Sequence, residues 1–259
     1  METDGAGRQP RNLLLKSCWD GNFHEIEDRF ARLTLTPGRT LYHGRLPIEM
    51  VHFIEEGLVA TTSASDPDHE PVGAWILGRE GVVCGIPVLL GVFTSPHKRV
   101  VLSKGHALSI RRADFIELLH ETPQLRAEML AHVHRVLAET TQLCACNARH
   151  SVEQRLARVL LTASDRLGGV DLPLTHRLLA QMLGTRRATI SDALQPLVDA
   201  RHLDMRRGAV TLLDRNALIE RACACYAIIA RLDHQAAHAP SRPACTPIHR
   251  SVEQPQGSV

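Results

Sequence analysis

A short segment in the C-terminal third of the chain combines hydroxyl, guanidinium and carboxylate side chains at close spacing. These side chains are Thr185, Arg186, Arg187, Thr189, Ser191 and Asp192. Their donors and acceptors have the lengths that reach phosphates and base edges when the first turns of a helix enter a major groove. The alternative is that Arg186 and Arg187 are ordinary surface charges on a helical hairpin.

Two short helices are expected on either side of Gly184, which can end the first helix in the left-handed conformation. Thr175 is the expected N-cap of the first helix and Thr185 that of the second, and Thr175 also joins the DNA-facing set. Small Ala180 and branched Ile190 fit the contact between the helices of a helix-turn-helix. The apolar positions with helical spacing are Leu178, Leu179, Met182, Leu183, Ile190, Ala193, Leu194 and Leu197.

A β-hairpin is expected directly after the second helix. Residues 203–206 and 209–213 can form strands that turn at Arg207 and Gly208. In this position Arg206 and Arg207 can contact the sugar-phosphate backbone, which receives half or more of protein–DNA hydrogen bonds. The alternative is a hairpin that caps the helical core, and both roles are compatible.

The segment 151–226 resembles the winged-helix domain of the Crp-Fnr family of bacterial transcription regulators. The motifs SVEQRLARVLL, LAQMLGTRRATIS and RRG occur in the family order. The resemblance implies an N-terminal β-roll of the cyclic-nucleotide-binding type, a long dimer helix and promoter control by an effector. Aligned on Gly184, Arg187 stands where relatives reach a guanine.

In the N-terminal half, Pro and Gly recur around short segments of β-branched residues over positions 35–110. This pattern indicates a compact all-β unit. Residues 11–34 are expected to be helical. The phrases VHFIEEGLVATTS and GHALSIRRADF resemble the family's β-roll. The alternative function is an effector-binding or enzymatic β-barrel with a C-terminal protein-interaction module. We expect no enzyme, because the histidines here lack the close pairing of barrel metal sites.

The expected effector pocket departs from the cyclic-nucleotide binders of the family. Those relatives carry a glutamate for the ribose hydroxyl and an arginine followed by small residues. Residues 85–99 contain no glutamate, Arg99 is followed by Val100 and Val101, and Pro96 is expected to turn Arg99 toward solvent. We therefore predict no binding of cyclic AMP below about millimolar, no cofactor and an unknown effector. The candidate pocket residues, which could instead be buried barrel lining, are Gly85, Ile86, Leu89, Leu90 and Arg99.

Residues 122–147 have the composition of a long helix with one apolar stripe. In the resembled family the partner of this stripe is a second copy of the chain, which matches a palindromic DNA site. The alternative is packing against the β-roll of the same chain, and one helix can do both. The stripe consists of Met129, Val133, Val136, Leu137, Thr140 and Cys144.

The sequence has seven cysteines at irregular spacing and no secretion signal, which predicts reduced thiols in a cytoplasmic protein. Two pairs, Cys144 with Cys146 and Cys223 with Cys225, raise the question of metal or redox chemistry. Residues two apart on a helix point about 200° away from each other, so neither pair alone can hold one ion. We expect no bound metal and leave a thiol-based redox role open.

The charge is unevenly distributed along the chain. Residues 1–150 hold 16 basic and 18 acidic side chains, whereas residues 151–232 hold 12 and 8, which gives net charges of −2 and +4. A basic C-terminal domain on an acidic body suits electrostatic approach to DNA. No apolar run approaches the roughly 18 residues of a membrane span.

These observations predict an α+β, homodimeric, cytoplasmic transcription regulator without membrane association. Its expected partners are double-stranded DNA, a second copy of the chain and RNA polymerase. The expected parts are a β-roll domain at 1–121, a dimer helix at 122–147, a winged helix-turn-helix at 148–232 and a disordered tail at 233–259.

Overall fold

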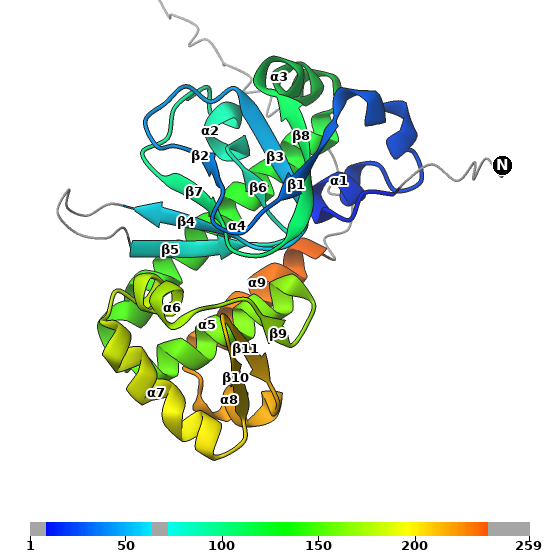
Figure 1. Ribbon diagram of the computed structural model, residues 1–259. Helices are drawn as coiled ribbons and strands as arrows, with labels where there is room; N and C mark the ends of the chain where they lie inside the picture. The colour runs from blue at the N-terminus through cyan, green and yellow to red at the C-terminus, as the bar shows by residue number, and fades with distance from the viewer. Residues whose placement is uncertain (1–8, 64–71, 238–259) are drawn as a thin grey trace, which may run out of the picture.

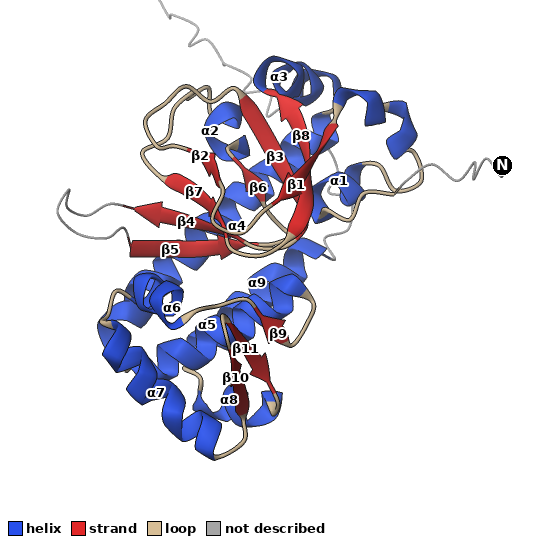
Figure 2. Cartoon of the chain, viewed as in Figure 1, coloured by secondary structure: helices blue, strands red, loops and turns tan. Residues whose placement is uncertain are grey.

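The computed structural model describes residues 9–63 and 72–237. It confirms the α+β class, with an N-terminal β-roll, a long helix and a C-terminal domain that carries most of the remaining helices (Figure 1). Strands fill the upper part of the molecule, and helices surround a small sheet in the lower part (Figure 2). None of the helices in the described ranges is long and apolar enough to cross a lipid bilayer.

The β-roll consists of two four-stranded antiparallel sheets, ordered β1-β8-β3-β6 and β2-β7-β4-β5. Its core includes Phe53, Val59, Val101, Ile110 and Phe115, all buried. The strands are β1 (Ala31–Leu35), β2 (Thr40–Tyr42), β3 (Met50–Glu56), β4 (Val59–Ser63), β5 (Val72–Leu77), β6 (Val82–Val83), β7 (Lys98–Val101) and β8 (Gly105–Arg111).

The segment before the β-roll is less helical than expected. Asn12 caps a short α1 (Leu13–Cys18), and two 3₁₀ turns, η1 (Phe23–Glu25) and η2 (Glu27–Arg29), follow. Residues 31–35 form strand β1 because they pair with β8 at the sheet edge. The single long helix expected over 11–34 is therefore wrong, since tertiary pairing outweighs local helical spacing.

Two helices lead from the β-roll to the rest of the chain. They are α3 (Arg112–Glu121) and α4 (Pro123–Arg149), and α4 is slightly longer than expected. Pro123 occupies the first turn of α4, where its missing N–H costs no helical hydrogen bond. His150 is the C-cap of α4.

The C-terminal domain begins at a capping box in which Ser151 and Gln154 bond to each other's backbone amides. It contains α5 (Val152–Leu167), β9 (Asp171–Leu172), α6 (His176–Leu183), α7 (Arg187–Asp199), β10 (Leu203–Arg206), β11 (Ala209–Leu212), α8 (Arg215–Arg221) and α9 (Cys225–Ala237). The expected tail is wrong at its start, because residues 233–237 complete α9. Residues 238–259 lie outside the described ranges.

The two domains share hydrophobic packing. Leu58, which precedes β4, and Ala60 and Ile76 of the second sheet belong to the same buried cluster as apolar residues of α5, α6 and α7. Helix α6 lies against β5, where a Cβ on Gly73 would stand 3.0 Å from the Cα of Met182. A side chain at position 73 would therefore require Met182 and the start of this contact to shift by a few tenths of an ångström.

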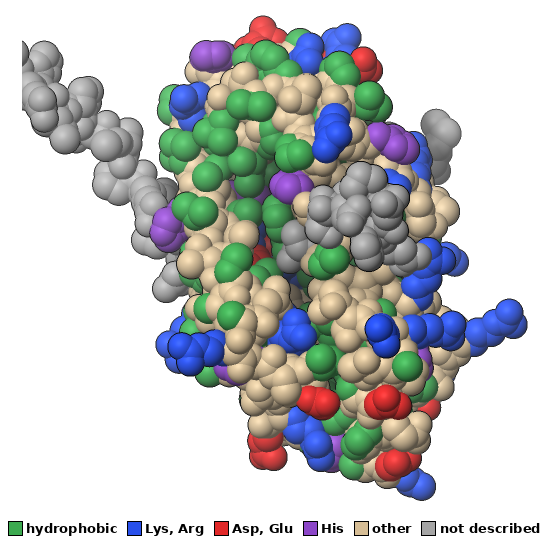
Figure 3. All heavy atoms as spheres, turned by 90° about the vertical axis from the view of Figure 1, so that its left-hand side faces the viewer, with side chains coloured by type: hydrophobic (Ala, Val, Ile, Leu, Met, Phe, Trp, Pro, Cys, Tyr) green, Lys and Arg blue, Asp and Glu red, His purple; other side chains and the backbone are tan. Residues whose placement is uncertain are grey.

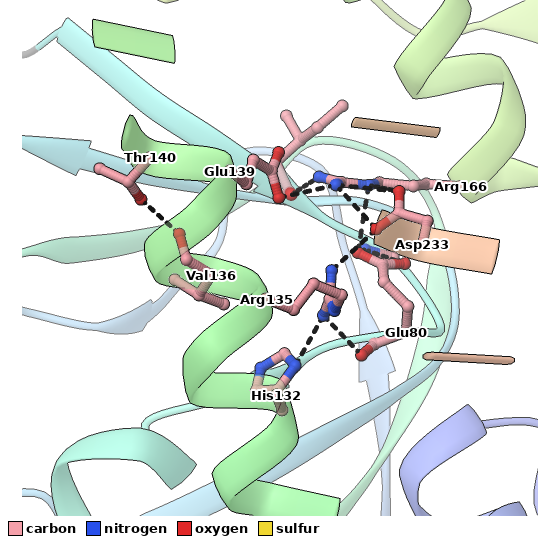
Figure 4. A network of polar contacts seen from close by, with 10 residues as sticks. Glu80, His132, Arg135, Val136, Glu139, Thr140, Arg166 and Asp233 are labelled. Carbon is pink, nitrogen blue, oxygen red and sulfur yellow. Dashed lines mark hydrogen bonds and ion pairs between the residues drawn. The ribbon is translucent and has the colours of Figure 1, made fainter. Parts of the chain in front are cut away.

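A buried polar network reinforces this junction (Figure 4). Arg166 of α5 donates to Glu139 of α4 at 2.9 Å and to Asp233 of α9 at 3.1 Å, and it pairs with Glu80 beside β6 at 3.3 Å. Arg135 of α4 donates to Asp233 at 2.9 Å and to the Glu80 carbonyl at 3.0 Å. Burial alone would lower the pKa of Arg166, but Glu139, Glu80 and Asp233 hold it well above its usual value.

Candidate nucleic-acid interface

Helices α6 and α7 form the predicted helix-turn-helix. The Thr175 hydroxyl accepts from the Leu178 amide at 3.1 Å, which confirms the N-cap. Gly184 has φ 59° and ψ 42° and ends α6 in the left-handed conformation. Ala180 and Ile190 are buried where the helices meet. Local sequence signals therefore place the front of α7 at the surface.

The first turn of α7 presents two exposed arginines, Arg186 and Arg187. Arg186, and not Thr185, is the N-cap, and no side chain caps the helix. Because no side chain caps α7, the amides of its first turn stay available to a phosphate, which the positive end of the helix favours. Arg186 and Arg187 can thus act together with the helix end.

Four further members of the predicted DNA-facing set lie around this turn. Thr185 and Thr189 are half-buried and Asp192 is exposed. Ser191 contacts the His176 Nδ1 at 2.9 Å and donates to the Arg187 carbonyl at 3.2 Å. These bonds tie α7 to the start of α6, so Ser191 has a structural role in addition to any contact with DNA.

Pro196 does not end α7. The helix continues to Asp199, and Pro196 is exposed on its surface. Proline removes one helical hydrogen bond, but packing of Leu194 and Leu197 in the shared core holds the last turn in place.

The wing is a three-stranded sheet with the order β10-β11-β9, and β9 is an addition to the predicted hairpin. Leu203, Val210 and Leu212 are buried, so the wing also caps the helical core. Arg206 and Arg207 are exposed at the turn. The Nε of Arg206 lies 3.2 Å from Asp204, an exposed pair that contributes little stability and can exchange for a phosphate.

Figure 3 shows one face of the molecule. Hydrophobic side chains gather on its upper part, over the β-roll, and basic side chains project from its lower part among some acidic ones. On this face the lower part therefore carries charges of both signs.

The predicted dimer stripe on α4 divides between two faces. Met129 is fully buried in the β-roll core, and Val133 packs against that core. Thr140 donates to the Val136 carbonyl at 2.7 Å. Leu137, by contrast, is 64% exposed, and Cys144 is exposed too. The assignment of Met129 to a dimer contact is wrong, because the β-roll of the same chain already covers it.

The expected effector pocket is also rearranged. Residues 85–89 form a short helix, α2 (Gly85–Leu89), in which Gly85 and Leu89 are buried and Ile86 is half-buried. Leu90 is 58% exposed and faces solvent. Arg99 is buried, and the expectation that Pro96 turns it outward is wrong.

Arg99 lies in a row of side chains that crosses the second sheet. The strand register pairs Trp75 with Thr61, Thr61 with Arg99, and Arg99 with Tyr42. The guanidinium stands 5.6 Å from the Trp75 ring centroid and donates to the His97 carbonyl at 3.1 Å. Burial lowers the pKa of Arg99, although Cys84 and Tyr42 oppose the shift. No carboxylate among the described residues pairs with it. Burial alternates along β7, with Arg99 and Val101 facing inward, but the sequence Lys-Arg-Val-Val does not show this alternation.

The fold and the exposed basic helix define a DNA-binding protein with a winged helix-turn-helix. Residues 154–221 match the Crp-like helix-turn-helix domain. The chain is 23% identical over 201 residues to the global nitrogen regulator of a Nostoc species. This alignment covers 74% of this chain and 87% of the relative. The protein is a transcription regulator of the Crp-Fnr type, as the sequence resemblance implied.

Solved structures agree with this assignment at the level of the fold. FixK2 from Bradyrhizobium japonicum superposes with a TM-score of 0.64 at 17% sequence identity. The superposition covers 75% of this chain and 98% of FixK2. A CRP-family transcriptional regulator from Thermus thermophilus has a TM-score of 0.61 at 19% identity and covers 73% and 96%.

Proposed function

We propose that this regulator binds a two-fold DNA site as a homodimer, and that it controls promoters in the cytoplasm by contact with RNA polymerase rather than by catalysis. The single observation that carries the proposal is the surface formed by the uncapped first turn of α7 and the wing turn. Arg186, Arg187, Arg206 and Arg207 are all exposed there. A basic helix end together with a basic wing turn suits contact with both base edges and phosphates.

An exposed stripe on α4 supports the dimer. The stripe contains Leu130, His134, Leu137, Thr141 and Cys144, all exposed, at alternating spacings of 4 and 3 residues. This spacing is typical of the seam between two packed helices. Leu130 is 49% and Leu137 64% exposed, which is costly for large apolar side chains unless a partner covers them. A second copy of α4 supplies the same pattern across a two-fold axis.

A selection of bound sequences from random DNA duplexes tests the proposed function with the full chain. We expect an enriched motif with two-fold symmetry and half-sites about one helical turn apart. Absence of any enriched sequence, with DNA retained only at low salt, would contradict sequence-specific binding. An enriched motif without symmetry would contradict the dimer while leaving the DNA-reading helix in place.

The dimer can be tested separately through Leu137. Leu137→Asp places a charge in the proposed seam, and we expect analytical ultracentrifugation to show a monomer where the wild type sediments as a dimer. Leu213→Asp is the matched control, because Leu213 is 55% exposed after β11 and away from α4. A dimer that survives Leu137→Asp would place the interface elsewhere.

A further inference from the structure

Three cysteines and a histidine converge where the end of α4 meets the connection between α8 and α9. Cys146 and His150 are four residues apart on α4 and its C-cap, and Cys223 and Cys225 flank the start of α9. The Sγ atoms of Cys146 and Cys223 are 3.5 Å apart, and the Cys225 Sγ lies 3.5 Å from the His150 Nδ1. All four potential ligand atoms lie within 4.8 Å of one another.

We propose that Cys146, His150, Cys223 and Cys225 bind one Zn²⁺ ion. Three cysteines and one histidine form one of the usual ligand sets of structural zinc sites. With Zn–S bonds of about 2.3 Å and Zn–N bonds of about 2.0 Å, tetrahedral geometry separates neighbouring ligand atoms by roughly 3.5 to 3.8 Å. The two 3.5 Å separations already lie at this value, so small side-chain rotations complete the site.

The backbone conformation explains why the cysteine spacing alone predicted no metal site. Cys144 and Cys146 are both helical, and Cys144 is exposed while Cys146 is buried, as residues two apart on a helix must be. Cys223 and Ala224 lie outside a helix, and α9 begins only at Cys225. The turn therefore brings Cys223 and Cys225 to the same side. The proposed site differs from the sequence-based expectation that no metal is bound.

The ligands form a closed pocket. Cys146, Cys223 and Cys225 are buried as a cluster of their own, separate from the two hydrophobic cores, and His150 is half-buried at its edge. Four protein ligands leave no open position on a tetrahedral ion, which is typical of a structural and not a catalytic site. Gln142 points its amide at the Cys225 Sγ from 3.0 Å, where an N–H can orient a thiolate ligand.

The charge around the site also fits. Three thiolates and a neutral histidine around Zn²⁺ carry a net charge of −1. Arg158 of α5 is buried and close enough to Cys146 for its positive charge to act on that sulfur. No carboxylate in the described part of the chain pairs with Arg158, and its Nε has no hydrogen-bond partner there. A buried cation of this kind is compensated by the anionic zinc centre.

The position of the ion gives it a role. It connects the C-terminal end of α4, which carries the proposed dimer seam, to the α8–α9 segment of the DNA-binding domain. Bound zinc would hold these elements together at a contact that the polar network of Arg166 does not include.

The test measures metal in the full-length protein, purified under reducing conditions without chelators from zinc-supplemented cells. We expect one Zn²⁺ per chain. Cys146→Ser should lose the ion, and Cys144→Ser, the matched control two residues away, should retain it. Chelated wild type titrated with Co²⁺ should show the visible bands of tetrahedral cobalt with thiolate ligands, and Zn²⁺ should then abolish them.

Variants at His150 keep the test valid if Cys146→Ser fails to fold, because His150 is only half-buried. We expect His150→Ala to bind Zn²⁺ at least tenfold more weakly and His150→Cys, with four thiolates, to retain it. Three results would overturn the proposal: metal-free protein with all thiols reactive, a disulfide between Cys146 and Cys223, or an iron–sulfur chromophore in place of a single ion.

Discussion

Arg187 and Arg206 are both exposed cations, yet their positions assign them different contacts with DNA. Arg187 begins α7, the helix that we propose enters the major groove, and Arg206 lies at the wing turn. We expect Arg187→Ala to cost about 1 to 3 kcal/mol at the specific site and to relax preference at one position per half-site. Binding to site variants, measured by fluorescence anisotropy, checks this.

Arg206→Ala is the matched comparison. A phosphate contact carries no sequence information, so we expect uniform weakening across sequences and a salt slope lower by about one. The carboxylate of Asp204 already competes for this guanidinium, which should keep the loss modest. If both variants relaxed base preference to the same degree, the division between helix and wing would be incorrect.

His52 predicts how stability changes with pH. It lies on β3, with its Nδ1 2.7 Å from the hydroxyl of Ser109 on β8, and burial together with Arg39 lowers its pKa to about 4. The unfolded chain takes up the proton near pH 6.5, well before the folded chain, so stability is lost as pH falls below that value. We expect a loss of roughly 2 kcal/mol from this group between about pH 7 and about pH 5.

Urea unfolding at the two pH values measures this loss. His52→Gln, which can keep a bond to Ser109, should remove most of it, and His120→Gln at the exposed end of α3 should not. An unchanged pH dependence in His52→Gln would assign the acid sensitivity to other groups, such as buried His132. Burial lowers the pKa of His132 as well, with Arg135 and Arg166 adding to the effect.

At the scale of elements, Arg166 joins α5, α4, α9 and the β-roll through one guanidinium (Figure 4). Arg166→Met would leave Glu80 and Glu139 buried without this partner. We expect a cost of about 3 to 5 kcal/mol, because an unpaired buried charge is penalised more than a pair is stabilised. Chemical denaturation with a conformational probe in each domain measures it.

Arg215→Met is the control for this prediction. Arg215 also pairs with an aspartate of α5, Asp165, at 2.6 Å, but both side chains are substantially exposed. We expect its loss to cost less than about 1 kcal/mol. Equal costs for the two variants would show that burial does not determine the contribution of the network.

At the scale of the whole molecule, a few β-roll residues, among them Ala60 and Ile76, belong to the hydrophobic cluster of the DNA-binding domain, so an effector in the β-roll could act on α6 directly. Cyclic AMP is not the effector we expect. Arg99 is buried inside the β-roll and could meet a phosphate, contrary to the sequence-based expectation. The remaining obstacle is α2, which offers no carboxylate for a ribose hydroxyl and loses one amide donor at Pro87.

Loss of that charged hydrogen bond weakens binding roughly 10- to 100-fold relative to a site that has it. We therefore expect calorimetry with cyclic AMP or cyclic GMP to show no micromolar binding, and specific DNA binding to occur without either nucleotide. A micromolar dissociation constant, or DNA binding that strictly requires a cyclic nucleotide, would refute this expectation.

The sequence by itself determined the parts of the protein whose signals are local. Thr175, Gly184 and the 3 and 4 spacing of apolar residues specify the helix-turn-helix, because caps, left-handed turns and one buried face act within a few residues. The same holds for the wing turn and for the length of α4. Family motifs in this region then implied the β-roll, which the fold confirms.

Only the tertiary structure decided which faces of these elements are covered. Met129 and Leu137 share a helix and a hydrophobic character, but the β-roll covers one and leaves the other exposed. Strand register directs Arg99 to the interior, and Glu80 pairs with Arg166 although the two residues are 86 positions apart in the sequence. Cys146 and Cys223 lie 77 residues apart, and their sulfurs meet because α9 returns along α4. Such contacts depend on long-range packing of whole elements, which no local spacing encodes.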